Sequence, residues 1–152
     1  MKTKFPYDHV VDCIQKIVWI DWNGNGQIGN ADITGSRSTP VQVFGSSANW
    51  KQVSAGSLHT AAIKTDGTLW TWGYGSQGAL GIDIAGATAK RCTPVTVFGS
   101  GTNWKQVSCG TQFMAAVKTD GTLWTWGIGT AGELGNADVT NKLTPITTFA
   151  GG

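Results

Sequence analysis

The chain has 152 residues, of which 13% are charged, 22 are glycine and 8 are tryptophan, and its formal net charge is +2. An average soluble domain carries about 25% charged residues, so this chain is poor in charge. Its 11 basic and 9 acidic side chains form no basic block, which excludes the positive stripe that a nucleic-acid backbone requires. The high glycine content also excludes a coiled coil or a helical bundle.

Residues 1–18 match no other part of the chain. Lys2 and Lys4 could mimic the basic start of a signal peptide, but charged residues and Pro6 interrupt any apolar run of the required length. We therefore predict no signal peptide and no membrane span. Residues 9–18 are expected to form a strand, with a short amphipathic helix as the alternative.

The next stretch spaces its oxygen-bearing side chains as a calcium-binding loop does. These side chains are Asp21, Asn23, Asn25, Gln27 and Asp32. Against calcium, the last position holds Asp rather than the usual bidentate Glu, and no exit helix is predicted after it. In addition, Gly29–Thr34 nearly recurs at Gly135–Thr140, where the preceding residues supply no ligands. We favour a loop that resembles a calcium site by chance, with calcium as the alternative, and predict no other metal, no cofactor and no catalytic residue.

Two long segments of the chain repeat each other without a gap. Residues 45–82 and 99–136 are identical at 25 of 38 positions. The ends of the two copies also correspond, since Thr93–Phe98 matches Thr144–Phe149 after a linker that is shorter in the second copy. The chain therefore contains two full copies of one repeat.

A partial copy precedes the two full ones. Residues 22–44 match the second half of a copy, with two residues missing before Gly29. In this alignment Asn23 takes the position of Gly73 and Gly127. We divide the chain into an N-terminal segment 1–18, a partial repeat 19–44, full repeats 45–98 and 99–149, and the start of a truncated further repeat 150–152.

Short apolar or alternating runs between turn residues predict four strands in each copy. In the first full copy these are Trp50–Ala55, Thr60–Lys64, Thr68–Trp72 and Val95–Phe98. The dipeptide Asp66-Gly67 predicts a tight hairpin between the second and third strands, because both residues readily adopt positive φ.

Both faces of the third predicted strand are suited to burial. Trp70 and Trp72 share one face, while Leu69 and Thr71 share the other. A sheet buried on both faces is therefore expected. Four short strands per unit, stacked sheet against sheet, are typical of an all-β fold such as a β-propeller.

Several single residues are interpreted by comparing the copies. Phe113 replaces His59, so His59 is expected to pack in the core rather than to act as a base. Cys109 takes the place of Ala55 and is expected to be a small buried thiol. Asp66 and Asp120 are expected to be turn residues, with a role as catalytic acids as the alternative. Four lysines recur with the copies and are expected to form solvated stripes, with a binding patch as the alternative: Lys51, Lys64, Lys105 and Lys118.

Many of the recurring positions resemble the repeat of the regulator of chromosome condensation (RCC1) family. They include Val53–Gly56, His59, Asp66–Gly67, Trp72–Gly73, Gly78–Gly81 and Pro94–Val95. The resemblance covers roughly residues 18 to 150. It implies that each copy is an RCC1-like β-propeller blade, a four-stranded antiparallel sheet. Seven blades close the ring in the best-known members, so two and a half copies predict an incomplete ring.

We interpret the chain as a non-enzymatic structural or protein-interaction module, since nearly identical copies leave no blade that has diverged to carry a catalytic site. A virion surface or tail component and a bacterial surface protein are its concrete forms, with a cytoplasmic or virion-associated location. Exposed blade faces are expected to bind a protein partner or to self-associate, without nucleic acid or a small-molecule substrate. The alternatives are a guanine-nucleotide exchange factor for a small GTPase, which the family's eukaryotic members imply, and a calcium-stabilised binding module.

Overall fold

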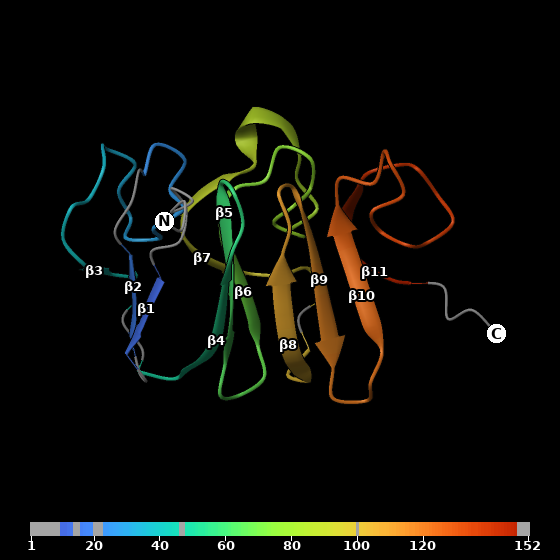
Figure 1. Cartoon of the computed structure of the whole chain (residues 1–152), viewed down its shortest axis with the longest axis horizontal. Helices are drawn as coiled ribbons and strands as arrows, with labels where there is room; N and C mark the ends of the chain where they lie inside the picture. Colours follow the sequence, from blue (N-terminus) through green and yellow to red (C-terminus); the bar gives the residue numbers. More distant parts are fainter. Residues whose placement is uncertain (1–9, 14–15, 20–22, 46–47, 100, 149–152) are drawn as a thin grey trace, which may run out of the picture.

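The computed structural model describes residues 10–13, 16–19, 23–45, 48–99 and 101–148. These residues form three antiparallel sheets that stand side by side, and each sheet is called a blade below (Figure 1). Among the residues described, no helix has the length and apolar character that crossing a bilayer requires.

The blades follow one another in chain order (Figure 1). The first blade contains β1 (Val10–Cys13), β2 (Lys16–Trp19) and β3 (Val41–Gln42) in that order. The second contains β4 (Trp50–Ala55), β5 (His59–Lys64), β6 (Leu69–Tyr74) and β7 (Lys90–Thr96), with a short 3-10 helix, η1 (Gly86–Thr88), before β7. The third contains β8 (Trp104–Cys109), β9 (Phe113–Lys118), β10 (Leu123–Gly127) and β11 (Lys142–Thr147). The predicted all-β fold is confirmed.

The first three predicted strands of the full copy lie within one or two residues of β4, β5 and β6, whereas the fourth was wrongly bounded. The outer strand β7 begins before the predicted Val95 and ends before Phe98. A register shift between Thr71 and Gly73 allows β7 to continue past the irregularity, so that Arg91 pairs with Gly73. Because this part of β7 lacks alternation, the sequence pattern did not reveal it. Phe98 lies beyond the strand and is 59% exposed.

Each full blade has an inner edge and an outer edge. The inner edges are β4 and β8, which contact each other. The outer edges are β7 and β11, and each contains a proline, Pro94 or Pro145. Proline has no N–H to donate to a ladder, so it is tolerated at an edge and obstructs pairing with a further strand.

The N-terminal segment pairs with the partial repeat to build the first blade. β1 and β2 form a hairpin in which Val10 pairs with Trp19, and Trp19 pairs in turn with Val41 of β3. The strand expected over residues 9–18 is therefore confirmed where the structure describes it, as two short strands rather than one. His9 and residues 14–15 lie outside the described residues.

The loop that follows β2 corrects the sequence alignment of the partial repeat. The amide of Gly26 donates to the carbonyl of Asn23, just as Gly78 donates to Gly75 and Gly132 donates to Gly129. Asn23 therefore stands at the position of Gly75 and Gly129, not at that of Gly73 and Gly127. The loop itself is complete, and Trp19 pairs with Val41 just as Thr71 pairs with Val95, so the two missing residues lie between Gly29 and Val41.

The second blade is buried on both faces, as predicted. Trp72 packs with Ile28 and Val43 of the first blade, and Leu69 packs in a cluster with residues of the third blade. Trp72, Leu69 and Thr71 are each 0% exposed. Such a middle sheet explains the low charge, because little of its surface meets water.

The predicted hairpin between β5 and β6 is confirmed, but its turn chemistry differs from the expectation. Gly67 has φ of +81°, and its amide donates to the Lys64 carbonyl at 2.9 Å. Asp66 keeps negative φ, and its Oδ1 accepts hydrogen bonds from the amide and the hydroxyl of Thr68 at 2.9 and 2.6 Å. These bonds hold the pKa of Asp66 below its ordinary value. Asp66 is thus a turn residue, as expected, acting through its side chain rather than through its backbone.

Gly67 and its counterpart Gly121 allow a matched test of blade contact. Both have positive φ, so alanine at Gly121 should lower the free energy of unfolding by about 1 to 2 kcal/mol through backbone strain. A Cβ at Gly67 would also overlap the Thr102 carbonyl oxygen, whereas nothing lies within 4 Å of a Cβ at Gly121. We expect Gly67→Ala to cost about 1 to 3 kcal/mol more than Gly121→Ala in urea unfolding followed by tryptophan fluorescence. Equal losses would contradict this packing.

Candidate protein-interaction surface

One tryptophan from each full blade joins that blade to the one before it. The indole N–H of Trp72 donates to the Gln27 carbonyl oxygen at 2.8 Å, and that of Trp126 donates to the Ala79 carbonyl oxygen at 3.0 Å. Gln27 and Ala79 hold equivalent places in their loops. A hydrogen bond satisfies each of these buried indole N–H groups, and it ties each full blade to the blade before it.

A glycine makes room for each of these indoles. A Cβ at Gly29 would lie 2.7 Å from Nε1 of Trp72, and a Cβ at Gly81 would lie 2.7 Å from Nε1 of Trp126. Real Cβ atoms do not approach so closely, so these two positions require glycine for contact as well as for their positive φ.

The inner strands are joined by side chains that bind backbone. Nε2 of Gln52 donates to the Val107 carbonyl at 2.9 Å, and its Oε1 accepts from the Val107 amide at 2.9 Å. Two residues on, the hydroxyl of Ser54 accepts from the Cys109 amide at 2.9 Å. The amide side chain of Gln52 thus supplies both hydrogen bonds that a neighbouring strand residue would supply.

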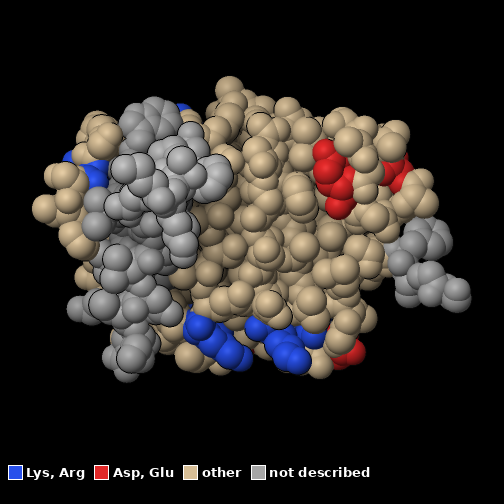
Figure 2. Space-filling view, viewed as in Figure 1, with Lys and Arg blue, Asp and Glu red and all other residues tan. Residues whose placement is uncertain are grey.

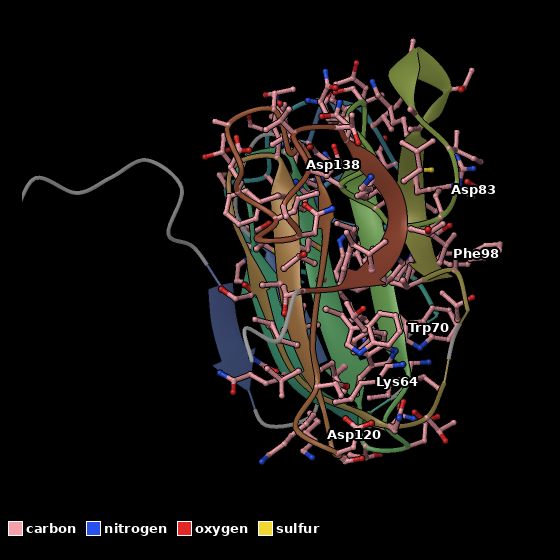
Figure 3. All side chains as sticks on the ribbon, turned by 90° about the vertical axis from the view of Figure 1, so that its right-hand side faces the viewer. Lys64, Trp70, Asp83, Phe98, Asp120 and Asp138 are labelled. Atoms are coloured by element: carbon pink, nitrogen blue, oxygen red, sulfur yellow. The ribbon has the colours of Figure 1, made fainter. Side chains whose placement is uncertain are left out.

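The third blade presents the same groups on the side turned away from the second blade. We call this surface the terminal face and define it by Gln106, Gly121, Leu123, Glu133 and Gly135. They are the counterparts of Gln52, Gly67, Leu69, Ala79 and Gly81. Figure 3 looks onto this side, with Asp120 at one end and Asp138 at the other.

Exposure distinguishes the terminal face from its covered counterpart. Leu123 is 41% exposed, whereas Leu69 is 0% exposed. Gln106, Glu133 and Gly135 are exposed as well. A cavity of about 580 Å³ lies open on this face, lined by Asp120, Gly121, Thr122, Leu123, Thr147 and Thr148. Apolar and hydrogen-bonding groups that are buried or half-buried in the second blade are therefore open to solvent in the third.

Four lysines were expected to form solvated stripes, and this interpretation is wrong for two of them, Lys64 and Lys118, which pack on tryptophan rings. Lys64 Nζ lies 4.1 Å from the ring centre of Trp70 and 5.0 Å from that of Trp50. Lys118 repeats this arrangement at 3.9 Å from Trp124. Both lysines are half-buried, because cation–π attraction and stem packing hold them on the rings.

The other two lysines of the set, Lys51 and Lys105, are exposed near the starts of β4 and β8. Basic side chains gather at the lower edge of the molecule in Figure 2, and acidic ones gather mainly at the opposite edge near the third blade. A cleft of about 260 Å³ beside Lys64 is lined by Phe44, Gly45, Trp50, Lys64, Trp70, Thr93 and Pro94.

The residues considered as calcium ligands are engaged in bonds within their loop. Asp21 lies outside the described residues. Oδ1 of Asn23 accepts from the Ile28 amide at 3.0 Å, and Oε1 of Gln27 accepts from the Asn25 amide at 3.0 Å. Among the described residues, no three His, Cys, Asp or Glu side chains gather as a metal site.

Asp32 also has a protein partner. It accepts from the amide and the hydroxyl of Thr34 and forms an ion pair with Arg37. Asp138 repeats the arrangement with Thr140 and Lys142. The hydrogen bonds from Thr34 lower the pKa of Asp32. Both aspartates therefore stabilise their own loops through these contacts. The calcium alternative stays a prediction.

Two further residues lie at the interface between the full blades. His59 is 1% exposed, and Cys109 donates its thiol hydrogen to the Ser54 carbonyl at 3.3 Å. Burial raises the pKa of the Cys109 thiol to about 12, which keeps it protonated and unreactive at neutral pH. Packing between the two full blades therefore accounts for the presence of both residues, as the comparison of the copies predicted.

The sequence reasoning did not single out Gln106, Leu123, Glu133 or Gly135. In the sequence each of these residues stands in the same local motif as its covered counterpart in the preceding copy. The signal that could have found them is the repeat itself, since every group that joins two blades must recur once more on the last described blade.

Stacked antiparallel blades, joined at fixed positions by tryptophan and glycine, define a β-propeller type of repeat protein. A family model for the regulator of chromosome condensation (RCC1) repeat matches residues 22–63 and 66–117. A second model of the same repeat matches residues 50–79 and 104–133. The chain belongs to the RCC1 repeat family, as its motifs indicated.

Known proteins share this similarity over part of their length. The chain is 36% identical over 125 residues to the ultraviolet-B receptor UVR8 of Arabidopsis thaliana, covering 81% of this chain and 28% of the receptor. It is 32% identical over 124 residues to the human E3 ubiquitin-protein ligase HERC2, covering 80% of this chain and 2% of the ligase.

Solved structures agree in fold. Yeast RCC1 (Prp20), solved bound to Kap60, superposes with a TM-score of 0.76 at 20% identity, covering 88% of this chain and 33% of that chain. Human WBSCR16 superposes with a TM-score of 0.74 at 18% identity, covering 91% and 36%. The chain thus spans about a third or less of each of these proteins.

The buried His59 predicts a loss of stability in acid. Burial lowers its pKa from 6.5 to about 4, so the folded protein resists a proton that the unfolded chain accepts. Stability should therefore be unaffected above about pH 6.5 and fall by about 3 kcal/mol as the pH drops from there to about 4.

The variant His59→Phe, which copies Phe113, should lose this acid dependence in urea unfolding measured from pH 7.5 to pH 4. Because both proteins retain His9 and the same carboxylates, the difference between their profiles isolates His59. Parallel pH profiles would contradict the prediction, because they would show that the pKa of His59 is the same in the folded and the unfolded protein.

Proposed function

We propose that the chain is a non-enzymatic structural or protein-interaction module that works within a larger assembly, and that the terminal face is its binding surface. The observation that carries the proposal is the exposure of Leu123 among hydrogen-bonding groups that are covered in the preceding blade. Burial of apolar surface contributes about 25 cal/mol per Å² to the free energy of association. A partner that covers Leu123, as the third blade covers Leu69, would gain this contribution.

The kinds of assembly that we propose are a virion surface or tail component and a bacterial surface protein. Their support is the near identity of the two full copies, which suits a rigid repeated surface better than a single specialised site. The binding role is consistent with the family, since yeast RCC1 was solved in complex with Kap60.

The proposal that the chain is not an enzyme is supported by His59 and by three of its aspartates. His59 is buried with its pKa at about 4, and Asp66, Asp120 and Asp138 each bind a threonine two residues on. The ligase activity named for HERC2 belongs to a protein of which this chain covers 2%.

The binding role is tested by Leu123→Asp. Because Leu123 is already 41% exposed, we expect a loss of folding stability of about 1 kcal/mol or less. Complexes isolated from the source organism through a tag on the protein should lose their protein partner when Leu123 is replaced. Phe44→Asp is the matched control, since Phe44 is 60% exposed but lies away from the terminal face. Partners retained by Leu123→Asp would contradict the role of this face.

Exchange of guanine nucleotides on a small GTPase is the second candidate, favoured by the structural likeness to yeast Prp20, whose binding to Gsp1p and histones has been described. That likeness is one of fold at 20% identity and covers 34% of the yeast chain. We expect no acceleration of fluorescent GDP release from a panel of small GTPases at micromolar protein. A release rate raised tenfold or more by any of them would favour the exchange factor over the structural module.

A further inference from the structure

The cleft beside Lys64 has the chemistry of a binding site that is separate from the terminal face. We propose that it binds one uronic acid unit of an acidic polysaccharide, with the carboxylate on the Lys64 ammonium and the sugar ring against Phe44. The equivalent residues of the next blade, Phe98 and Lys118, hold a further unit of the same polymer. The chain binds this polymer without converting it, so the inference goes beyond the proposed function and does not depend on it.

The first argument is a lysine whose charge has no oxygen partner. Nζ of Lys64 lies 4.1 Å from the ring centre of Trp70, and no carboxylate among the described residues lies within 4.0 Å of it. Lys90 and Lys142, by contrast, donate hydrogen bonds to oxygen atoms of the protein. A cation–π contact leaves the N–H groups that point away from the ring free to donate. A carboxylate that enters the cleft would accept a charge-assisted hydrogen bond from them.

The acidic groups at this end of the molecule do not neutralise it. Oδ1 of Asp66 is bonded to the amide and the hydroxyl of Thr68. Where β4 and β8 begin and β5 and β9 end, the full blades carry four lysines, at 51, 64, 105 and 118, against two aspartates, at 66 and 120. Basic side chains gather at the lower edge of the molecule in Figure 2, and Figure 3 places Lys64 toward that edge. This excess of positive charge attracts an anionic ligand.

The second argument is an aromatic ring that is open to solvent at the rim of the cleft. Phe44 is 60% exposed, and its counterpart Phe98 projects from the margin of the molecule in Figure 3. The face of an aromatic ring carries partial negative charge and attracts the C–H groups along one side of a sugar ring. The cleft volume of about 260 Å³ lies below the roughly 300 to 1,000 Å³ of sites for drug-sized ligands, and it suits a single sugar unit.

The outer strand disfavours a peptide as the occupant. Peptides that bind beside a sheet commonly add a strand to it, which requires free backbone groups along the edge. Pro94 lines the cleft and belongs to the outer strand β7, so the edge lacks an N–H at this point. A sugar polymer needs no such ladder, since it binds through its ring faces, hydroxyls and carboxylates. The hydroxyl of Thr93, which also lines the cleft, can bond to one of these hydroxyls.

The third argument is that the arrangement recurs in the next blade. Nζ of Lys118 lies 3.9 Å from the ring centre of Trp124 and 4.8 Å from that of Trp104, which repeats the geometry of Lys64. Each residue that lines the cleft has a counterpart of the same type one repeat later, from Phe98 and Gly99 to Thr144 and Pro145. Two like sites one blade apart suit a ligand whose own units repeat, because one polymer chain can occupy both and bind more tightly.

The proposal is tested by titrating the full chain with tetrasaccharides of galacturonic, glucuronic or mannuronic acid while NMR follows the tryptophan indole N–H signals. The variants Trp70→Phe and Trp124→Phe assign the two signals of interest. We expect at least one probe to shift both signals saturably. Its methyl ester, which keeps the sugar but removes the charge, should bind at least about tenfold more weakly.

Variants at two lysines separate the cleft from general charge. Lys64→Met keeps an unbranched stem on the rings but removes the ammonium, so binding read at Trp70 should weaken at least about tenfold while binding read at Trp124 is unchanged. Lys64→Arg restores a cation and should recover binding to within about fivefold. Lys51→Met is the matched control, because Lys51 is exposed at the same end, and it should change binding less than about twofold.

Occupation of both sites by one polymer is measured with the parent polysaccharide of the best probe. The polysaccharide should bind at least about tenfold more tightly per chain than its tetrasaccharide, and Lys118→Met should remove this gain. A gain that survives Lys118→Met would overturn the second site.

The absence of a saturable shift with every sugar, or equal binding of an acid and its methyl ester, would overturn the proposal. Equal weakening by Lys64→Met and Lys51→Met would also overturn it, because binding would then follow net charge alone. An acetylated and amidated Asp-Phe peptide, or oligothymidylate, that shifts the Trp70 signal at lower concentration than every sugar would assign the cleft to a protein segment or to nucleic acid instead. Leu123→Asp tests the terminal face separately from all of these outcomes.

Discussion

The hydrogen bond from a tryptophan indole to a loop carbonyl of the preceding blade is the contact on which the rest of the arrangement depends. A fully buried Trp72 would lose stability if its N–H lacked a partner, and the Gln27 carbonyl supplies one at 2.8 Å. The bond requires a glycine at position 29 and brings the apolar residues of two blades together. At this contact the hydrogen bond, the glycine and the buried apolar side chains of two blades meet at one place.

Repetition made most of the fold predictable. β4 was predicted with its observed bounds because its pattern and its flanking turns are explicit in the sequence. The start of β7 was missed because a register shift opposite Gly73 breaks the alternation on which strand prediction relies. The position of Asn23 was misassigned because sequence matching joined two tryptophans, whereas the turn hydrogen bonds align Asn23 with Gly75.

The candidate surface was predictable only in part. The sequence indicated that blade faces would be exposed, but Gln106 and Gln52 stand in the same local motif and differ only in whether a neighbouring strand lies beside them. Burial depends on neighbours, which a local motif does not record. The lysines show the same limit, since Lys51 is exposed as expected while Lys64 rests on two indole rings.

The prolines of the outer strands restrict how further strands can pair with the sheets. Pro94 and Pro145 lie on the edges at which a sheet could otherwise grow by recruiting another strand. With that route obstructed, units can be added by stacking face on face but poorly by widening a sheet. The two prolines therefore protect the outer strands against the sideways aggregation to which open β-sheets are prone.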